Sequence, residues 1–228
     1  MEQDISVSDR GVVRLAVSAY PETVRATWSM ALVTAITGEA LFSVMPTEPS
    51  DLESAIKFGV GLMASFLLYA VFETLMTRRA MIQAFAMEVR ISQVGPAIAL
   101  AALMTAFLTL GLIALVVPVF IMGIRWWVAM PVLYAEGLAT RAALKRSRAL
   151  MKGKWKSIVP VILLVCAMSW LAIPALYGVD SMDPLGHTIS IAVNTLTIPL
   201  WVATMVASYV HLRRYEDVNG SLSPKPVS

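Results

Sequence analysis

Charged residues are scarce in this 228-residue chain and make up 14% of it, whereas 58% of the residues are apolar. A water-soluble domain of this length usually carries about 25% charged residues. The mean hydropathy of +0.73 reflects the same imbalance. Because 18 basic residues accompany 15 acidic ones, the net charge of +3 is too small to indicate nucleic-acid binding. The composition therefore predicts an integral membrane protein.

Cysteine and histidine are also rare, with one Cys (Cys166) and two His in the chain. A single cysteine excludes an internal disulfide framework and a cysteine-rich metal site. The sequence contains no H-E-x-x-H, no G-x-S-x-G and no glycine-rich phosphate-binding motif. We therefore expect no enzymatic activity, no metal and no cofactor. The first 26 residues hold seven charges and no apolar core, so we expect no cleaved signal peptide.

Long apolar runs are what this sequence has in abundance. A membrane-spanning helix needs roughly 20 mainly apolar residues. The stretches that meet this requirement are residues 27–45, 55–76, 96–117, 118–135, 157–177 and 188–209. The third and fourth form one continuous run, which we divide at Pro118 because proline cannot continue a helix normally. The sequence thus predicts an all-α fold, a bundle of six transmembrane helices in one domain over residues 1–215. Residues 216–228 should form a disordered cytoplasmic tail.

The segments between the apolar runs differ in charge. Residues 46–54 and 178–187 contain acidic residues and neither Lys nor Arg, whereas residues 136–156 contain seven basic residues. Loops rich in Lys and Arg stay on the cytoplasmic side of a membrane. We therefore expect a multi-pass membrane protein with both termini in the cytoplasm.

Two segments have the periodicity of amphipathic helices that lie at a membrane interface. In the first, the apolar residues Val12, Leu15, Ala16 and Ala19 share one helix face, and Arg14 lies outside it. This short helix should lead into the first span.

The second amphipathic segment covers residues 136–156, and Gly153 should end its helix. Its basic residues recur every three or four positions along one face. This basic stripe consists of Arg141, Lys145, Arg148, Lys152 and Lys156. The apolar side should consist of Leu144, Met151 and Trp155. The stripe either binds anionic lipid headgroups or a partner protein, or it only sets the membrane topology.

Three ionisable residues, Glu39, Glu73 and Arg125, lie inside the predicted spans. At about 1.5 Å per residue, Glu39 lies roughly 18 Å from the inner boundary, Arg125 about 15 Å and Glu73 about 5 Å. We therefore expect Glu39 to pair with Arg125, either to orient helices or to line a polar cavity. Glu73 should meet Arg78, Arg79 or water.

The segment between the last two spans gathers Asp180, Asp183 and His187, which could in principle bind a metal ion. Gly and Pro in this short segment favour a solvated turn instead.

Residues 118–159 read PVFIMGIRWWVAMPVLYAEGLATRAALKRSRALMKGKWKSIV. An apolar helix that starts with Pro and contains Arg is followed by Pro, by Glu-Gly, by an Ala-Leu-x-x-Ser helix and by Leu-x-x-Gly. This stretch resembles the bacterial family of glycerophosphoryl diester phosphodiesterase membrane domains and related six-span membrane proteins. The matching positions are Pro118, Arg125, Pro131, Glu136, Gly137, Ala143, Leu144, Ser147, Leu150 and Gly153.

The resemblance implies a module of a bacterial inner membrane, without catalytic activity of its own. Some members of that family are fused to a soluble phosphodiesterase domain, but no segment between the apolar runs is long enough to form one. We expect a non-enzymatic module that binds lipid headgroups or a partner protein through its basic cytoplasmic surface. The alternative is a small transporter that uses Glu39, Glu73 and Arg125. A water-accessible cavity reaching Arg125 would favour the transporter.

Overall fold

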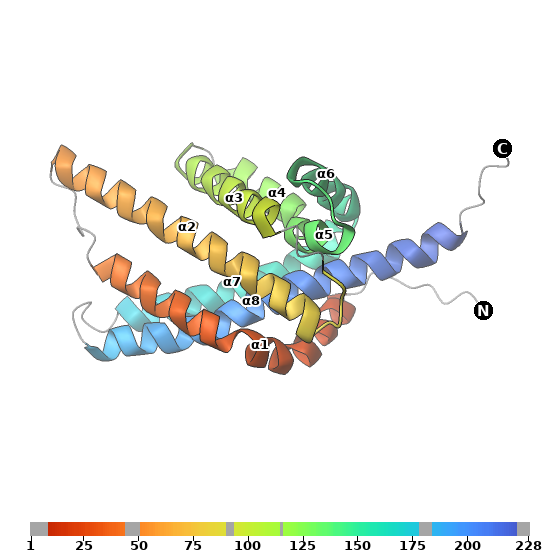
Figure 1. Cartoon of the computed structure of the whole chain (residues 1–228), viewed down its shortest axis with the longest axis horizontal. Helices are drawn as coiled ribbons and strands as arrows, with labels where there is room; N and C mark the ends of the chain where they lie inside the picture. Colours follow the sequence, from red (N-terminus) through yellow and green to blue (C-terminus); the bar gives the residue numbers. More distant parts are fainter. Residues whose placement is uncertain (1–8, 44–50, 90–93, 115, 178–183, 223–228) are drawn as a thin grey trace.

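Figure 1 shows the computed structural model of the chain, which describes residues 9–43, 51–89, 94–114, 116–177 and 184–222. The elements in these ranges are all helices, so the predicted all-α class is confirmed. In chain order they are α1 (Asp9–Ser43), α2 (Leu52–Gln83), α3 (Val94–Ala114), α4 (Val116–Trp126), α5 (Ala129–Glu136), α6 (Thr140–Met151), α7 (Trp155–Tyr177) and α8 (Pro184–Leu222).

The long helices α1, α2, α7 and α8 run lengthwise through the molecule, and α1 packs against both α2 and α8 (Figure 1). The end of α1, the start of α2, the end of α7 and the start of α8 lie together at the left of Figure 1. Helices α5 and α6, the start of α7 and the end of α8 lie at the opposite end. The basic segment 136–156 therefore lies at one end of the bundle. The helix ends that flank the acidic segments 46–54 and 178–187 lie at the other end.

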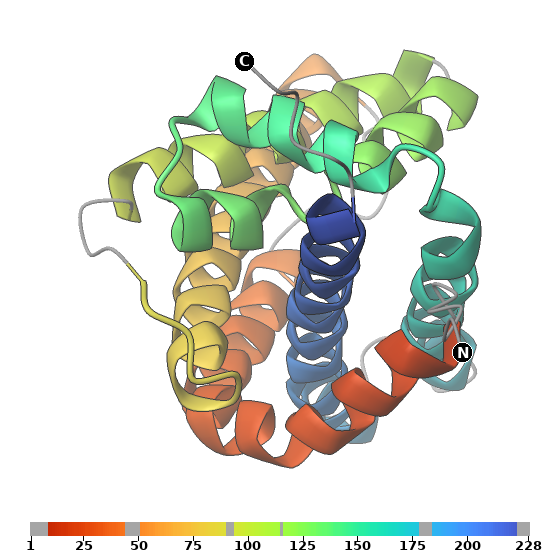
Figure 2. The same cartoon turned by 90° about the vertical axis from the view of Figure 1, so that its right-hand side faces the viewer.

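Helix α1 combines the predicted interfacial helix and the first predicted span. Val12, Ala16 and Ala19 are buried and Arg14 is exposed, as predicted, whereas Leu15 of the predicted apolar face is only half-buried. Viewed from the end in Figure 2, the first part of α1 crosses the bundle before the helix recedes along it. Pro21 lies inside α1 and removes one backbone hydrogen bond there, a common cause of helix bending.

Residues 118–135, the predicted fourth span, do not form the one continuous helix that we expected. Helix α4 ends at Trp126 and α5 begins at Ala129. Pro131 explains the break, because its ring would clash with the carbonyl of Trp127 in a continuous helix. In the first turn of α5 its missing N–H group costs nothing. An 11-residue α4 is about 16 Å long, roughly half the hydrocarbon thickness of a bilayer.

Helix α5 lies in the core, and every residue from Trp126 to Tyr134 is buried. The Tyr134 hydroxyl donates a hydrogen bond to the backbone oxygen of Thr74 in α2 at 3.2 Å. The Trp127 indole donates one to the Ser208 hydroxyl in α8, also at 3.2 Å. These two buried bonds tie α5 and the turn before it to the long helices α2 and α8.

Two helical segments, Leu52–Gln83 and Gly186–Val218, are long and apolar enough to cross a membrane by length and composition. A core helix of a soluble protein can meet the same criterion. In Leu52–Gln83, however, only 7% of the apolar window is buried, unlike a core helix. Membrane association is thus supported by these two helices, and the other predicted spans are not supported in this way.

The last residues that the structure describes are helical. Residues 216–222 belong to α8, so the prediction of disorder from residue 216 is wrong for them, and residues 223–228 lie outside the described residues.

Candidate functional site

Helix α6 is amphipathic, and it buries Ala143, Ser147, Leu150 and Met151. The predicted apolar side was partly wrong, because Leu144 is only half-buried and Trp155 is exposed. The small side chains of Ala143 and Ser147 let the helix approach the bundle closely. The Ser147 hydroxyl donates a hydrogen bond to the backbone oxygen of Arg125 at 2.9 Å, which joins α6 to the end of α4.

The basic stripe lies on the opposite side of this segment. All five of its side chains, Arg141, Lys145, Arg148, Lys152 and Lys156, are exposed. None of them forms an ion pair with a carboxylate in the part of the chain that the structure describes. The stripe continues from α6 over the turn into α7. Gly153 lies in this turn and has a φ of +77°. Such a left-handed residue ends a helix, as expected for Gly153.

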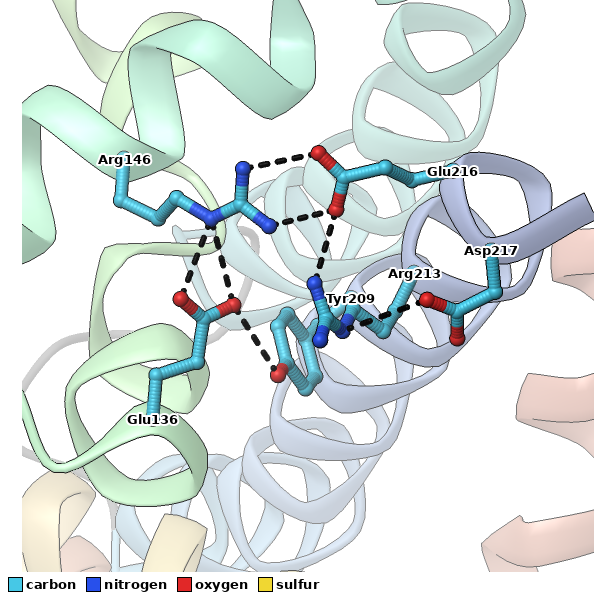
Figure 3. Close-up of polar contacts among 6 residues, drawn as sticks. All are labelled: Glu136, Arg146, Tyr209, Arg213, Glu216 and Asp217. Atoms are coloured by element: carbon cyan, nitrogen blue, oxygen red, sulfur yellow. Dashed lines mark hydrogen bonds and ion pairs between the residues drawn. The ribbon is translucent and has the colours of Figure 1, made fainter. Parts of the chain in front are cut away.

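The neighbouring basic residue Arg146 points inward, into the ionic cluster of Figure 3. We use this name for Glu136, Arg146, Tyr209, Arg213, Glu216 and Asp217. Arg146 Nε donates to Glu136 Oε2 at 3.0 Å, and its Nη1 donates to Glu216 Oε1 at 2.8 Å. A second bond from Nη2 to Glu216 makes that contact bidentate. Arg213 Nη1 also donates to Glu216, at 2.9 Å.

The ionic cluster joins the end of α5, the middle of α6 and the end of α8. Hydrogen bonds from Arg146, followed by its charge and by Arg213, hold the pKa of Glu216 below its ordinary value. Lys154 is also turned inward, with its Nζ 3.9 Å from the centre of the Tyr215 ring. Burial lowers the pKa of Lys154. Arg146 and Lys154 thus have partners inside the fold, whereas the side chains of the basic stripe are exposed and form no ion pair with a carboxylate among the described residues.

Sequence reasoning missed the ionic cluster. A local signal existed, because Arg213 and Glu216 are three residues apart on one helix. The contact between Arg146 and Glu216 joins residues 70 positions apart, and no periodicity connects them.

The residues on which we based the resemblance to the membrane-domain family lie in α4, α5 and α6 and in the turns after α5 and α6. Glu136 is the last residue of α5 and binds Arg146. Gly137 ends that helix with φ 65° and ψ 30°, and its N–H bonds to the Leu133 oxygen at 3.0 Å. A left-handed residue is most easily glycine. These residues therefore shape the turn that presents the basic stripe.

The predicted pair between Glu39 and Arg125 is wrong. Glu39 Oε1 lies 2.6 Å from His187 Nδ1, and the Ser190 hydroxyl donates to Glu39 Oε2 at 2.9 Å. Arg125 is exposed near the end of α4. We had estimated that the two residues lie at the same depth in the membrane. They do not meet, because α1 packs on α8 along its length and Glu39 faces α8.

His187 belongs to the first turns of α8, and its expected neighbours Asp180 and Asp183 lie outside the described residues. Within the described ranges, no group of three or more His, Cys, Asp or Glu residues could hold a metal ion.

Glu73 does not have the neighbours that we expected near the membrane surface. Its side chain is half-buried, and Tyr69 of α2 and Trp201 of α8 lie near its carboxylate. Glu73 therefore faces α8 and the interior of the bundle.

A cavity of about 420 Å³ lies between α1, α2 and α8. Its lining consists of Thr34, Ala35, Gly38, Glu39, Tyr69, Asn194, Thr197, Ile198 and Trp201. The cavity reaches Glu39, but its lining does not include Arg125. A cavity that reached Arg125 would have favoured a transporter, and this cavity is not lined by Arg125.

Comparisons of the chain with protein-family models, with curated proteins and with solved structures found no match.

Proposed function

We propose that this chain is a multi-pass protein of a bacterial inner membrane that binds anionic lipid headgroups through the basic stripe. The membrane placement is supported by large apolar side chains exposed on several helices. They include Ile36 on α1, Val60 and Met63 on α2, Phe107 on α3, Leu164 on α7 and Leu196 on α8. Exposed apolar residues scattered singly are normal, but a belt around a bundle suits a lipid environment.

In this proposal α1, α2, α3, α7 and α8 supply five crossings, and the broken pair α4 and α5 supplies the sixth. Both termini and the basic stripe lie on the cytoplasmic side, as the charge of the connecting segments predicts. The resemblance of residues 118–159 to the membrane-domain family is in keeping with this arrangement.

The observation that carries the headgroup-binding proposal is the contrast between the stripe and its basic neighbours. Arg146 and Lys154 have partners inside the fold, whereas the five side chains of the stripe are exposed and pair with no carboxylate in the part of the chain that the structure describes. A basic residue near an anionic leaflet contributes about 1 kcal/mol to membrane binding. Trp155, which is exposed beside Lys156, suits the headgroup level of a membrane, where tryptophan is enriched.

The experiment measures lipid binding to the purified full chain in neutral detergent by native mass spectrometry. Phosphatidylglycerol should bind more tightly than phosphatidylcholine. The double variant Lys145→Gln/Arg148→Gln should lose about 2 kcal/mol, or roughly 30-fold in affinity for phosphatidylglycerol. Added salt should weaken the binding because it screens exposed charges.

The matched control is Arg25→Gln/Lys57→Gln, which removes two positive charges from equally exposed positions. Both side chains already pair with carboxylates, Arg25 with Glu22 at 2.9 Å and Lys57 with Glu53 at 2.6 Å. The control should keep the affinity of the unaltered protein. Equal binding of the two lipids, or equal losses in the two double variants, would leave the stripe as a topology signal only.

The proposed orientation has its own test in intact cells, using a Cys166→Ala background and an impermeant thiol reagent. Glu53 and Ala149 are exposed at opposite ends of the bundle, so a cysteine at either position is accessible. Glu53→Cys should react with reagent added outside, and Ala149→Cys should react only after the cells are opened. The reverse labelling pattern would invert the topology and remove the stripe from the cytoplasm.

A further inference from the structure

The cavity beside Glu39 has the size of a site for a small organic molecule. Its volume of about 420 Å³ falls within the range of roughly 300–1,000 Å³ that is usual for ligand sites. A second cavity of about 300 Å³ shares Thr34, Gly38 and Tyr69 with it. A side chain carbon built at Gly38 would meet no atom within 4 Å, so this glycine faces open space.

The polar groups of the cavity suit a cation. Glu39 contributes a carboxylate that accepts one contact on each oxygen, from His187 and from Ser190. A carboxylate has about four acceptor positions, so Glu39 can accept further hydrogen bonds. The lining contains neither Lys nor Arg among the described residues, and His187 is the basic group that faces Glu39.

The aromatic groups of the cavity indicate which kind of cation it would bind. Tyr69 and Trp201 line it from α2 and α8, and Trp201 is held in place by edge-on contact with Trp127, at 4.7 Å between ring centres. Aromatic faces attract organic ammonium groups, and more strongly where water is excluded. A metal ion is not favoured, because no group of three or more His, Cys, Asp or Glu residues among the described residues could hold one.

We propose that this cavity binds an organic ammonium ion, with the charge beside Glu39 and the alkyl groups against Tyr69 and Trp201. The site is independent of the basic stripe, which lies at the other end of the bundle and attracts the opposite charge. The ammonium group belongs either to a free amine or to the headgroup of a lipid, because both present the same chemistry to the cavity.

The test is calorimetric titration of the purified full chain in neutral detergent with tetraethylammonium chloride. Binding should be saturable and unaffected by an equal concentration of sodium chloride. Glu39→Gln should weaken it at least tenfold. Glu53→Gln is the matched control, because Glu53 is an exposed carboxylate in the first turn of α2 and lies outside the lining. This control should bind like the unaltered protein.

Two further variants keep the test decisive if Glu39→Gln does not fold. Trp201→Leu removes the aromatic face, and Gly38→Leu fills the open space without changing a charge. Each should weaken binding at least tenfold. A parallel titration with a short-chain phosphatidylcholine separates the two sources of the ammonium group, since saturable binding there indicates a lipid headgroup. Unchanged affinity in the folded variants, or full competition by sodium, would overturn the proposal.

Discussion

Replacing Arg146 by glutamine should destabilise the protein more than the same change at any residue of the basic stripe. The Arg146 side chain is 25% exposed, and its partners Glu136 and Glu216 are 19% and 36% exposed. The substitution leaves Glu136 without its ion-pair partner, because the Tyr209 hydroxyl is its other contact in the ionic cluster. Glu216 keeps Arg213.

The size of the effect follows from this partial burial. Exposed ion pairs contribute about 0–1 kcal/mol, whereas breaking a fully buried pair costs about 3–5 kcal/mol. Arg146 binds two carboxylates at intermediate exposure, so we expect a loss of about 2 kcal/mol. Arg148 is exposed and has no carboxylate partner, so Arg148→Gln should change the free energy of unfolding by at most about 0.5 kcal/mol.

Chemical unfolding of the purified variants in detergent measures both losses. A double-mutant cycle with Glu216→Gln isolates the contact between α6 and α8, and contacting residues in such cycles couple by about 0.5–3 kcal/mol. Lipid affinity should follow the opposite order, with Arg148→Gln more harmful than Arg146→Gln. Equal stability of Arg146→Gln and Arg148→Gln, or strictly additive losses in the cycle, would refute the reasoning.

Two more predictions concern stability. Gly38→Ala should stabilise α1 by about 0.5–1 kcal/mol, because alanine suits a helix interior and its Cβ meets open space. Gly11→Ala in the same helix should destabilise the protein, because its Cβ would lie 2.8 Å from His211 Cε1; a stabilising effect in thermal unfolding would contradict this packing. Arg146 lowers the pKa of Glu216 from its ordinary value of 4.5, so the contribution of that carboxylate is complete above pH 4.5 and is lost as pH falls through the lower pKa of the folded state. Stability measured at descending pH should therefore fall less steeply in Glu216→Gln, and an unchanged slope would show that this pairing does not contribute.

The sequence by itself determined the helical class and the features that depend on local geometry. Apolar residues at helical spacing placed Val12, Ala16 and Ala19 on the buried face of α1. Gly153 marked the end of α6 because few other residues adopt a positive φ readily. The break before α5 was also within reach, since Pro131 acts on the carbonyl four residues before it. The long apolar run concealed it.

Only the tertiary structure decided which distant side chains meet. Glu39 binds His187, 148 positions away, rather than the residue at equal estimated depth. Arg146 is enclosed by carboxylates while Arg148, two residues later, stays exposed. Two steps of about 100° along α6 put these two side chains on nearly opposite faces, but which face meets the core depends on how α6 packs on α4 and α8. The cavity beside Glu39 likewise arises where three helices diverge, which depends on their mutual packing and on no single segment of the chain.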